Sequence, residues 1–220
     1  MNIVITGSSR GIGKAVAERF LSEGHAVFGI DLLPASIKNG SYRHTIADVR
    51  KPETLPEIPD VAILFINAGT QNGGDDIAVN LVGAMNVAEK YCGSPALRSV
   101  LFNASASAVT GQEFPAYAAS KAGVLGYMKN LAIRLAPRGV TVNAISPGGV
   151  TTESNDPVTR DPALWKKIMD VTPLKKWATV DEIADWVIFL TLANRSMSGQ
   201  NLLIDNGEKD LNSTFVWTEE

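Results

Sequence analysis

A tyrosine and a lysine at helical spacing form a candidate acid/base pair. Tyr117 and Lys121 are the ends of the run Tyr-Ala-Ala-Ser-Lys, and residues four apart lie on one face of a helix. A free phenol titrates at about pH 10, and a neighbouring ammonium lowers its pKa by favouring phenolate. The pair is therefore a candidate for proton transfer. By itself the spacing is equally compatible with a half-buried tyrosine beside a solvated lysine.

A glycine-rich turn lies near the N-terminus. The run Thr-Gly-Ser-Ser-Arg-Gly-Ile-Gly follows an apolar segment and opens one with helical spacing. Backbone N–H groups at the start of a helix bind phosphates, and glycines allow close approach of the backbone. The glycine spacing is one residue longer than the usual dinucleotide fingerprint, so an ordinary tight turn is the alternative. The predicted pyrophosphate contacts are Gly7, Ser9, Arg10, Gly11, Ile12 and Gly13.

An acidic residue follows the second apolar run. Asp31 lies 20 residues beyond Gly11, where a carboxylate hydrogen-bonds the ribose 2′-hydroxyl of NAD. A 2′-phosphate would meet a like charge there, so NAD is predicted over NADP. Arg10 keeps NADP open, because a guanidinium can pair with a 2′-phosphate. Leu32, beside Asp31, is included among the predicted cofactor contacts.

These residues need a scaffold of alternating strands and helices. Apolar runs predict strands at 2–6, 26–30, 61–66, 99–103, 140–145 and 202–204. Between several of these strands, apolar residues recur at helical spacing, which predicts helices, including one at 115–135. The alternation predicts an α/β fold, a single doubly wound parallel sheet with helices on both faces. One domain is expected over 1–207, with a lid loop and short helix at 148–178 and a tail at 208–220 whose Phe215 and Trp217 are expected to dock.

Composition excludes several other classes. The chain has 220 residues and a formal net charge of −3, so it lacks the basic field that a nucleic-acid or acidic-membrane partner requires. Cys92 is the only cysteine, which excludes a disulfide-stapled secreted domain and favours the cytoplasm. We see no signal peptide and no apolar run long enough to span a membrane. Neither His25 nor His44 belongs to a cluster with zinc spacing, so no metal is predicted.

Four motifs in order resemble the short-chain dehydrogenase/reductase family. They are the glycine-rich start, Asn67-Ala68-Gly69, Tyr117-x-x-x-Lys121, and Asn143-Ala-Ile-Ser-Pro-Gly148 followed by Val150 and Thr152. The resemblance runs from residue 2 to about 207. It implies a Rossmann-type fold and hydride transfer between a nicotinamide cofactor and an alcohol or ketone.

The resemblance also implies roles for individual residues. Tyr117 is similar to the family's general acid/base and Lys121 to its partner, which also holds the nicotinamide ribose. Ser105 resembles the serine that binds the substrate oxygen, with Ser107 as the alternative, and Asn80 resembles the asparagine of the proton relay. The further cofactor contacts implied are Asp48, Val49, Asn67, Ala68, Gly69, Pro147, Gly148, Val150 and Thr152.

The sequence departs from the family beside the expected substrate site. Only 18 residues separate Asp48 from Asn67 and only 10 separate Gly69 from Asn80, where relatives usually have longer segments. The first difference is expected to shorten a helix and the second to remove a wall of the site. Trp165, Met169 and Trp177 suggest an apolar substrate under a lid, while sugars, polyols and acyl thioesters remain alternatives.

The favoured function is an NAD-dependent dehydrogenase that interconverts a secondary alcohol and a ketone. An NADPH-dependent 3-oxoacyl reductase is one alternative, and a non-catalytic nucleotide-binding regulator is another. A homodimer or homotetramer that pairs the helices at 76–91 and 115–135 is expected, because small residues on the second helix allow close approach.

Overall fold

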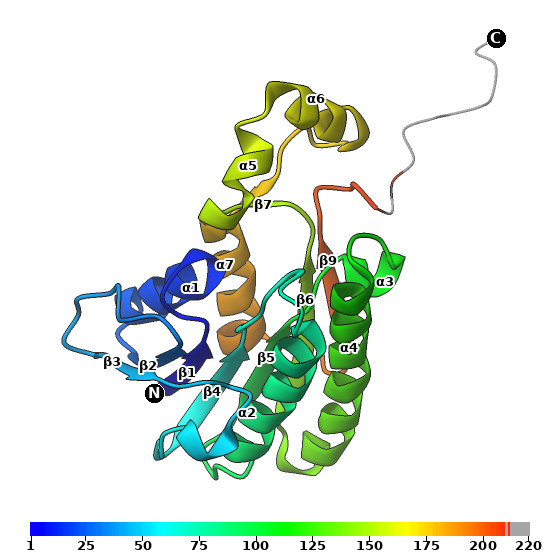
Figure 1. Ribbon diagram of the computed structural model, residues 1–220. Coiled ribbons are helices and arrows are strands. Elements are labelled where there is room, and N and C mark those ends of the chain that lie inside the picture. The colour runs from blue at the N-terminus through cyan, green and yellow to red at the C-terminus, as the bar shows by residue number, and fades with distance from the viewer. Residues whose placement is uncertain (210, 212–220) are drawn as a thin grey trace.

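The computed structural model describes residues 1–209 and 211. Within them, seven parallel strands form one sheet in the order β3-β2-β1-β4-β5-β6-β9 (Figure 1). The strands are β1 (Asn2–Thr6), β2 (Ala26–Asp31), β3 (Tyr42–Ile46), β4 (Val61–Ile66), β5 (Ser99–Asn103), β6 (Thr141–Pro147) and β9 (Asn201–Ile204). The predicted doubly wound α/β fold is confirmed.

Helices cover both faces of the sheet. On one face lie α1 (Gly11–Ser22) and α7 (Val180–Ile188), which pack against each other; on the other lie α2 (Ala84–Tyr91) and α4 (Pro115–Leu135) (Figure 1). The short elements η1 (Pro52–Thr54), α3 (Ser107–Thr110) and η3 (Ala136–Arg138) lie in the connections. The π-helix η2 (Ile77–Gly83) leads into α2, and a second, η5 (Phe189–Ala193), follows α7.

Two buried cores follow from the alternation of side chains along the strands. Val4 and Leu64 point to the α2 and α4 side, while their neighbours Ile3, Ile63 and Phe65 point to the α1 and α7 side. Successive side chains of a strand face opposite sides, and a parallel sheet covered on both faces has no polar face. This explains why all six residues of β4 are buried and why the strands were recognisable as continuous apolar runs.

Three segments differ from the sequence-based expectation. Strand β3 was missed because its sequence Tyr-Arg-His-Thr-Ile is largely polar, as the edge of a sheet permits. The segment between β3 and β4 contains only the turn η1, which confirms the expected shortening. The first part of the expected lid region at 148–178 holds β7 (Val150–Thr151), η4 (Glu153–Asn155) and α5 (Asp156–Thr159), followed by α6 (Pro162–Val171).

The segment that contains α5 and α6 projects from the carboxyl edge of the sheet (Figure 1). Its base is fixed where β7 pairs with β8 (Ala178–Thr179). Phe215 and Trp217, on which the expected docking of the tail rests, lie outside the described residues. Among the described helices, none is long and apolar enough to cross a membrane.

The sheet reverses its winding between β1 and β4. The chain leaves β1 toward α1 on one face and leaves β4 toward η2 on the other, which opens a crevice at the carboxyl ends of these strands. Thr6 ties the two strand ends together: its buried hydroxyl accepts the N–H groups of Asn67 at 2.9 Å and of Ala68 at 3.0 Å. The rim of the crevice is therefore held by a side chain.

We predict that Thr6→Val destabilises the protein by about 1–3 kcal/mol, because the valine leaves two buried N–H groups without an acceptor while keeping the shape of the side chain. Urea unfolding measures the loss. Thr45→Val on the edge strand β3 is the matched control, and equal stability of the two variants would contradict the role given to Thr6.

Candidate active site

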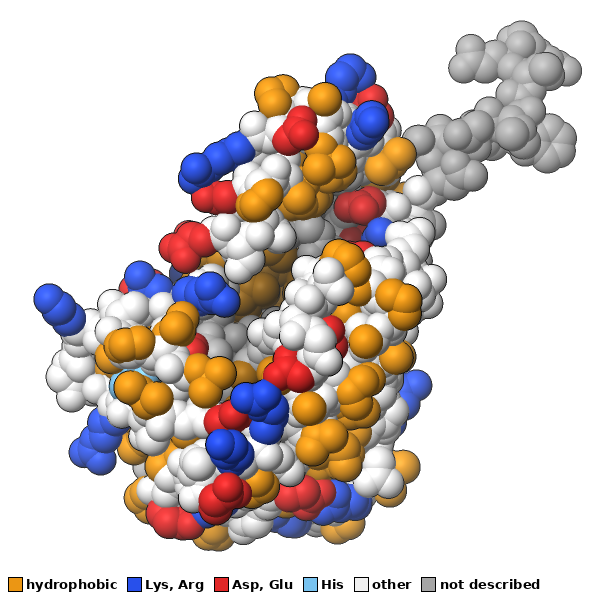
Figure 2. Space-filling model, viewed as in Figure 1, with side chains coloured by type: hydrophobic (Ala, Val, Ile, Leu, Met, Phe, Trp, Pro, Cys, Tyr) orange, Lys and Arg blue, Asp and Glu red, His pale blue; other side chains and the backbone are white. Residues whose placement is uncertain are grey.

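A cleft of about 810 Å³ runs along the carboxyl edge of the sheet. It opens between the projecting α5 and α6 segment and the main body, where Figure 2 shows the surface hollowed. Most predicted cofactor and catalytic residues line it: Gly7, Arg10, Gly11, Ile12, Asp31, Leu32, Asp48, Val49, Asn67, Ala68, Gly69, Ser105, Tyr117, Lys121, Pro147, Gly148, Val150 and Thr152. Three predicted site residues do not line it: Ser9, Gly13 and Asn80.

The glycine-rich loop is fixed by close backbone packing. Gly7 and Gly11 have φ values of 68° and 53°, a left-handed conformation that favours glycine. At Gly13, a Cβ atom would lie 2.0 Å from the carbonyl oxygen of Gly7, so a side chain is excluded. The loop therefore brings the start of α1, with its free N–H groups, to the cleft.

Asp31 lies where β2 ends, beside this loop. Its Oδ2 accepts the N–H of Ser9 at 2.9 Å and its Oδ1 accepts the N–H of Leu33 at 2.9 Å. Ser9 thus contributes by fixing Asp31 rather than by lining the cleft. Arg10 is exposed and lines the same cleft. Asp31, which favours NAD, and Arg10, which keeps NADP open, therefore both face the cleft.

An ion-pair network occupies the neighbouring wall. Arg50 contacts the Asp48 carboxylate at 2.7 Å and the Asp75 carboxylate at 2.5 Å. The Arg50 guanidinium, through its hydrogen bonds, holds the pKa of Asp48 below its usual range. Arg50 and Asp75 both line the cleft, and neither was recognised from the sequence.

The opposite wall follows β6. Gly148 packs against Asp205, because a Cβ atom there would lie 2.7 Å from the Asp205 Cβ. Thr152 approaches Gly11 across the cleft, with its Cγ2 3.6 Å from where a Gly11 Cβ would be. Trp177 packs over Gly149 and meets Trp165 edge to face, with ring centroids 5.2 Å apart. The two tryptophans pack on each other, and Met169 does not line the cleft.

Tyr117 and Lys121 enter the cleft from one face of α4. Lys121 is 4% exposed, and its Nζ donates to the backbone oxygen of Asn103 at 2.7 Å. Burial lowers the pKa of Lys121 to about 8. The Lys121 ammonium lies 5.8 Å from the centre of the Tyr117 ring.

The pKa of Tyr117 is raised from its ordinary value. Burial is the main cause, the hydroxyl of Ser105 acts in the opposite direction, and the charges of Glu113 and Asp76 add to the rise. The ammonium alone was expected to lower this pKa. The expectation fails in this structure because burial disfavours the charged forms of both members of the pair.

Ser105 faces the cleft and Ser107 lies directly behind it. The two Oγ atoms are 2.9 Å apart, and both side chains are buried. The Ser107 hydroxyl donates to Glu113 Oε2 at 2.8 Å, and Gln71 Nε2 donates to the same oxygen at 2.9 Å. Of the two serines, Ser105 is placed to touch a substrate. Glu113 and Gln71 line the cleft as well, and neither was recognised from the sequence.

Asn80 lies in the π-helix η2, a kind of distortion that is frequent at functional sites. Its amide exchanges two hydrogen bonds of 2.8 Å with the backbone of Thr70 and donates to Ser120 Oγ at 3.0 Å. Asn80 thus fixes the strand-following segment next to Lys121. Asn86, the next asparagine along the chain, donates to the Val49 backbone oxygen at 3.0 Å and does not line the cleft.

The cleft fits a nicotinamide dinucleotide. The glycine-rich loop allows its backbone to approach a pyrophosphate closely, and the Asp31 carboxylate can accept a hydrogen bond from a ribose hydroxyl. The side-chain oxygen Oδ1 of Asn103, in the cleft wall, is buried and has no hydrogen-bond partner among the described residues. Such an oxygen requires a donor, which a hydroxyl-rich or amide-bearing cofactor supplies.

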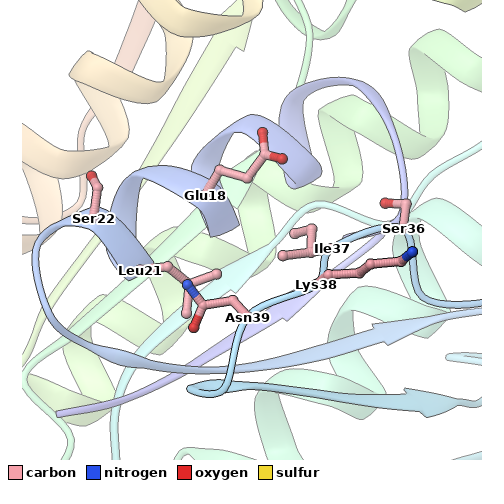
Figure 3. Close-up of a pocket in the computed structure, with 7 residues that line it drawn as sticks. All are labelled: Glu18, Leu21, Ser22, Ser36, Ile37, Lys38 and Asn39. Carbon is pink, nitrogen blue, oxygen red and sulfur yellow. The ribbon is translucent and has the colours of Figure 1, made fainter.

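A second, smaller hollow of about 330 Å³ lies between the end of α1 and the segment 36–39. Figure 3 shows Glu18 and Leu21 on α1 facing Ile37 and Lys38 across it. It contains none of the predicted site residues, so the chemistry is assigned to the large cleft.

Comparison with known proteins agrees with this geometry. The family described as enoyl-(acyl carrier protein) reductase matches residues 62–209. Glucose 1-dehydrogenase of Gluconobacter oxydans is 27% identical over 240 residues, covering 93% of this chain and 90% of that protein. The 3-oxoacyl-(acyl-carrier-protein) reductase FabG of Buchnera aphidicola is 26% identical over 233 residues, covering 92% of this chain and 95% of that protein.

A solved structure extends the similarity over the fold. An oxidoreductase of the short chain dehydrogenase/reductase family from Burkholderia thailandensis superposes with a TM-score of 0.87 at 28% identity, covering 96% of this chain and 93% of that one. The chain therefore belongs to the short-chain dehydrogenase/reductase family, whose oxidoreductases bind NAD or NADP.

Proposed function

We propose that the protein is an NAD-dependent dehydrogenase that interconverts a secondary alcohol and a ketone. The observation that carries the proposal is the arrangement of Tyr117, Lys121 and Ser105 at one end of a cleft whose other end is a phosphate-binding loop. A regulatory binding protein has no chemical need for the tyrosine and the lysine. Residues 1–207 are proposed as the catalytic domain, with 148–178 as its lid.

Tyr117 is proposed as the general acid and base. Because the pKa of Tyr117 is raised, the protein alone favours the neutral phenol, which is the form that donates a proton to a ketone oxygen. Ser105, on the same wall, would bind that oxygen. The bound nicotinamide supplies the hydride or accepts it. In the oxidation direction Tyr117 must instead hold a negative charge, and Lys121 is the buried cation nearest to it.

NAD is proposed as the cofactor because of Asp31. Its carboxylate accepts two backbone N–H groups and is thereby fixed beside the glycine-rich loop. There it would bind a ribose 2′-hydroxyl and repel a 2′-phosphate.

Arg10 supports a second candidate function, an NADPH-dependent 3-oxoacyl reductase. Its guanidinium reaches the cleft beside Asp31, and FabG is among the similar proteins.

The cleft lining favours a polar substrate. The lining of the cleft includes Gln71, Glu113 and Lys209. Of the two tryptophans that pack on each other, Trp177 lines the cleft and Trp165 does not. Carboxylates and amides pair with substrate hydroxyls, and glucose 1-dehydrogenase is among the similar proteins. We therefore place sugars and polyols first among the secondary alcohols to be tested.

A homodimer or homotetramer is also proposed. Exposed apolar side chains lie on the paired helices η2, α2 and α4, among them Val82, Met85 and Ile133. A contact between copies of the chain would cover them. Cytoplasmic location remains a prediction from the cysteine content.

The first experiment titrates the purified protein with NADH and NADPH and then follows NADH formation with D-glucose, cyclohexanol and ethyl 3-hydroxybutyrate. Preferential NADH binding with turnover of one alcohol is expected. Preferential NADPH binding would favour the reductase, and tight binding without turnover would favour the regulator.

Tyr117→Phe is expected to lower kcat by about 100-fold or more, because the ring remains but the transferable proton is lost. Its Kd for NADH should stay unchanged. Tyr127→Phe removes a hydroxyl from the same helix at a position bonded to Glu89 and is the control. Full activity of Tyr117→Phe would overturn the assigned role.

Asp31→Asn is expected to bring the Kd for NADPH down by about 10-fold relative to that for NADH, since the amide removes the charge that faces a 2′-phosphate. Fluorescence titration with both nucleotides measures this. Glu18→Gln removes an equal charge at the small hollow of Figure 3 and should change neither Kd. An unchanged preference in Asp31→Asn would mean that Arg10 decides it.

Lys121→Met is expected to stabilise the fold near neutral pH by about 1–3 kcal/mol while abolishing turnover, because it replaces a buried charge by an apolar chain. The pKa of Lys121 is about 8 in the folded protein and 10.5 as the ordinary value. Below pH 8 the Lys121 side chain is charged in both the folded and the unfolded protein, so the folded protein is destabilised by the full free-energy cost of burying that charge.

Above this pKa the unfolded chain binds more protons, so the stability of the unmodified protein rises with pH. The advantage of Lys121→Met should therefore shrink as pH rises from 8 to 10.5. Thermal unfolding across this range, with exposed Lys129→Met on the same helix as control, measures it. If the difference in stability between Lys121→Met and the unmodified protein stays constant across this pH range, the titration of Lys121 is refuted.

A further inference from the structure

Tyr42 and His44 on the edge strand β3 connect the glycine-rich loop with the segment that follows Asp31. The Tyr42 hydroxyl lies 2.9 Å from Ser8 Oγ and 3.1 Å from His44 Nδ1. The other ring nitrogen of His44, Nε2, lies 2.9 Å from the carbonyl oxygen of Leu33. Ser8 and Tyr42 are buried, so water is kept away from the bond between them.

The hydrogens in this series of bonds have one direction when His44 is neutral. A carbonyl oxygen only accepts, so His44 Nε2 carries the proton and donates to Leu33. Nδ1 of the neutral imidazole is then an acceptor for the hydroxyl hydrogen of Tyr42, and Tyr42 in turn accepts from Ser8. The Tyr42 hydroxyl thus determines which ring nitrogen of His44 holds the proton.

The series closes into a cycle of hydrogen bonds that includes Asp31. The carbonyl oxygen of Leu33 accepts from His44, while the N–H of Leu33 donates to Asp31 Oδ1. The N–H of Ser9 donates to Asp31 Oδ2. Ser9 follows Ser8 in the chain, and its hydroxyl also donates to the Leu33 oxygen at 3.3 Å. Both backbone groups that hold the Asp31 carboxylate are therefore themselves fixed.

A glycine in the sheet makes room for this cycle. Gly29 on β2 lies opposite His44 in the register of the two strands. A Cβ atom at Gly29 would lie 2.2 Å from the Tyr42 hydroxyl oxygen and 2.4 Å from Ser8 Oγ. Glycine inside a strand often marks a close approach of other groups. Any side chain at this position would displace Tyr42 from Ser8.

We propose that Tyr42 and His44 are positioning residues that set the orientation of Asp31 and, through it, the preference for NAD over NADP. His44 holds the Leu33 backbone with its N–H on the carboxylate, and Tyr42 holds His44 in the tautomer that does so. Neither Tyr42 nor His44 lines the cleft, so both act through Asp31. The inference rests on the proposed function, in which Asp31 binds the ribose 2′-hydroxyl.

Two substitutions of His44 separate its two hydrogen bonds. The amide nitrogen of glutamine can take the place of Nε2 and keep the bond to Leu33, whereas the shorter asparagine reaches only the place of Nδ1. His44→Asn should therefore raise the Kd for NADH by about fivefold, the effect of one lost hydrogen bond, and His44→Gln by about twofold or less. Fluorescence titration with NADH and NADPH measures these changes.

The preference between the two nucleotides distinguishes positioning of Asp31 from a general loss of structure. A displaced carboxylate loses the ribose 2′-hydroxyl but also repels a 2′-phosphate less, so the Kd for NADPH should not rise in His44→Asn. The KM for NAD should rise while kcat at saturating NAD stays unchanged, because Tyr117 and Lys121 lie at the other end of the cleft. Tyr42→Phe breaks the cycle at another bond and should shift the preference in the same direction.

The double variant Asp31→Asn/His44→Asn shows whether His44 acts through Asp31. Its nucleotide preference should equal that of Asp31→Asn alone, since two changes that act through one group do not add. His25→Asn, before the opposite end of β2, is the matched control and should change neither Kd. Thermal unfolding checks that the variants fold.

Nitrogen NMR of the isotope-labelled, unmodified protein tests the cycle without any substitution. Above neutral pH and with NADH bound, His44 should carry its proton on Nε2 and none on Nδ1. A proton on Nδ1 would exclude the bond to Leu33 and with it the proposed role.

The positioning role would also be overturned by an unchanged ratio of the two Kd values in folded His44→Asn and Tyr42→Phe, or by an effect of His44→Asn that adds in full to that of Asp31→Asn. Each of these results leaves the proposed function intact. An unmodified protein that binds neither nucleotide would instead overturn the proposed function, and this role with it, since Asp31 would have no ribose to bind.

Discussion

One chain of hydrogen bonds around two asparagines holds the candidate site together. Asn67 Nδ2 donates to the carbonyl oxygens of Thr6 and Gly7, and its Oδ1 accepts Asn103 Nδ2 at 2.8 Å. The backbone oxygen of Asn103 then accepts Lys121 Nζ. The phosphate loop after β1 is thus connected through β4 and β5 to the lysine of α4. Because these groups are part-buried, loss of either asparagine side chain leaves others without partners.

This connection explains how a chain with a shortened wall keeps its proposed catalytic residues in place. The distance between a phosphate loop and a catalytic helix is set by the strands, not by the loops that follow them. The loop after β4 is short. Even so, the Asn80 side chain hydrogen-bonds both the N–H and the carbonyl oxygen of Thr70, and it also donates to Ser120 on α4. The shortening therefore removed surface and retained the contacts that fix Lys121.

Much of this arrangement was predictable because it depends on local rules. Continuous apolar runs predict buried parallel strands, and the tight approach of Gly13 to Gly7 requires glycines at fixed spacing. Tyr117 and Lys121 follow from helical periodicity. The polar edge strand β3 and the roles of Arg50, Gln71 and Glu113 were not predictable. Arg50 contacts Asp75 and Gln71 contacts Glu113 across 25 and 42 positions of the chain, so no local pattern marks these contacts.

The pKa of Tyr117 shows the same limit in energetic terms. Sequence spacing identifies the ammonium that would stabilise a phenolate, but it contains no information on burial or on carboxylates brought in by other segments. In the structure both enter: burial acts against charge on Tyr117 and Lys121 alike, and Glu113 and Asp76 oppose the phenolate.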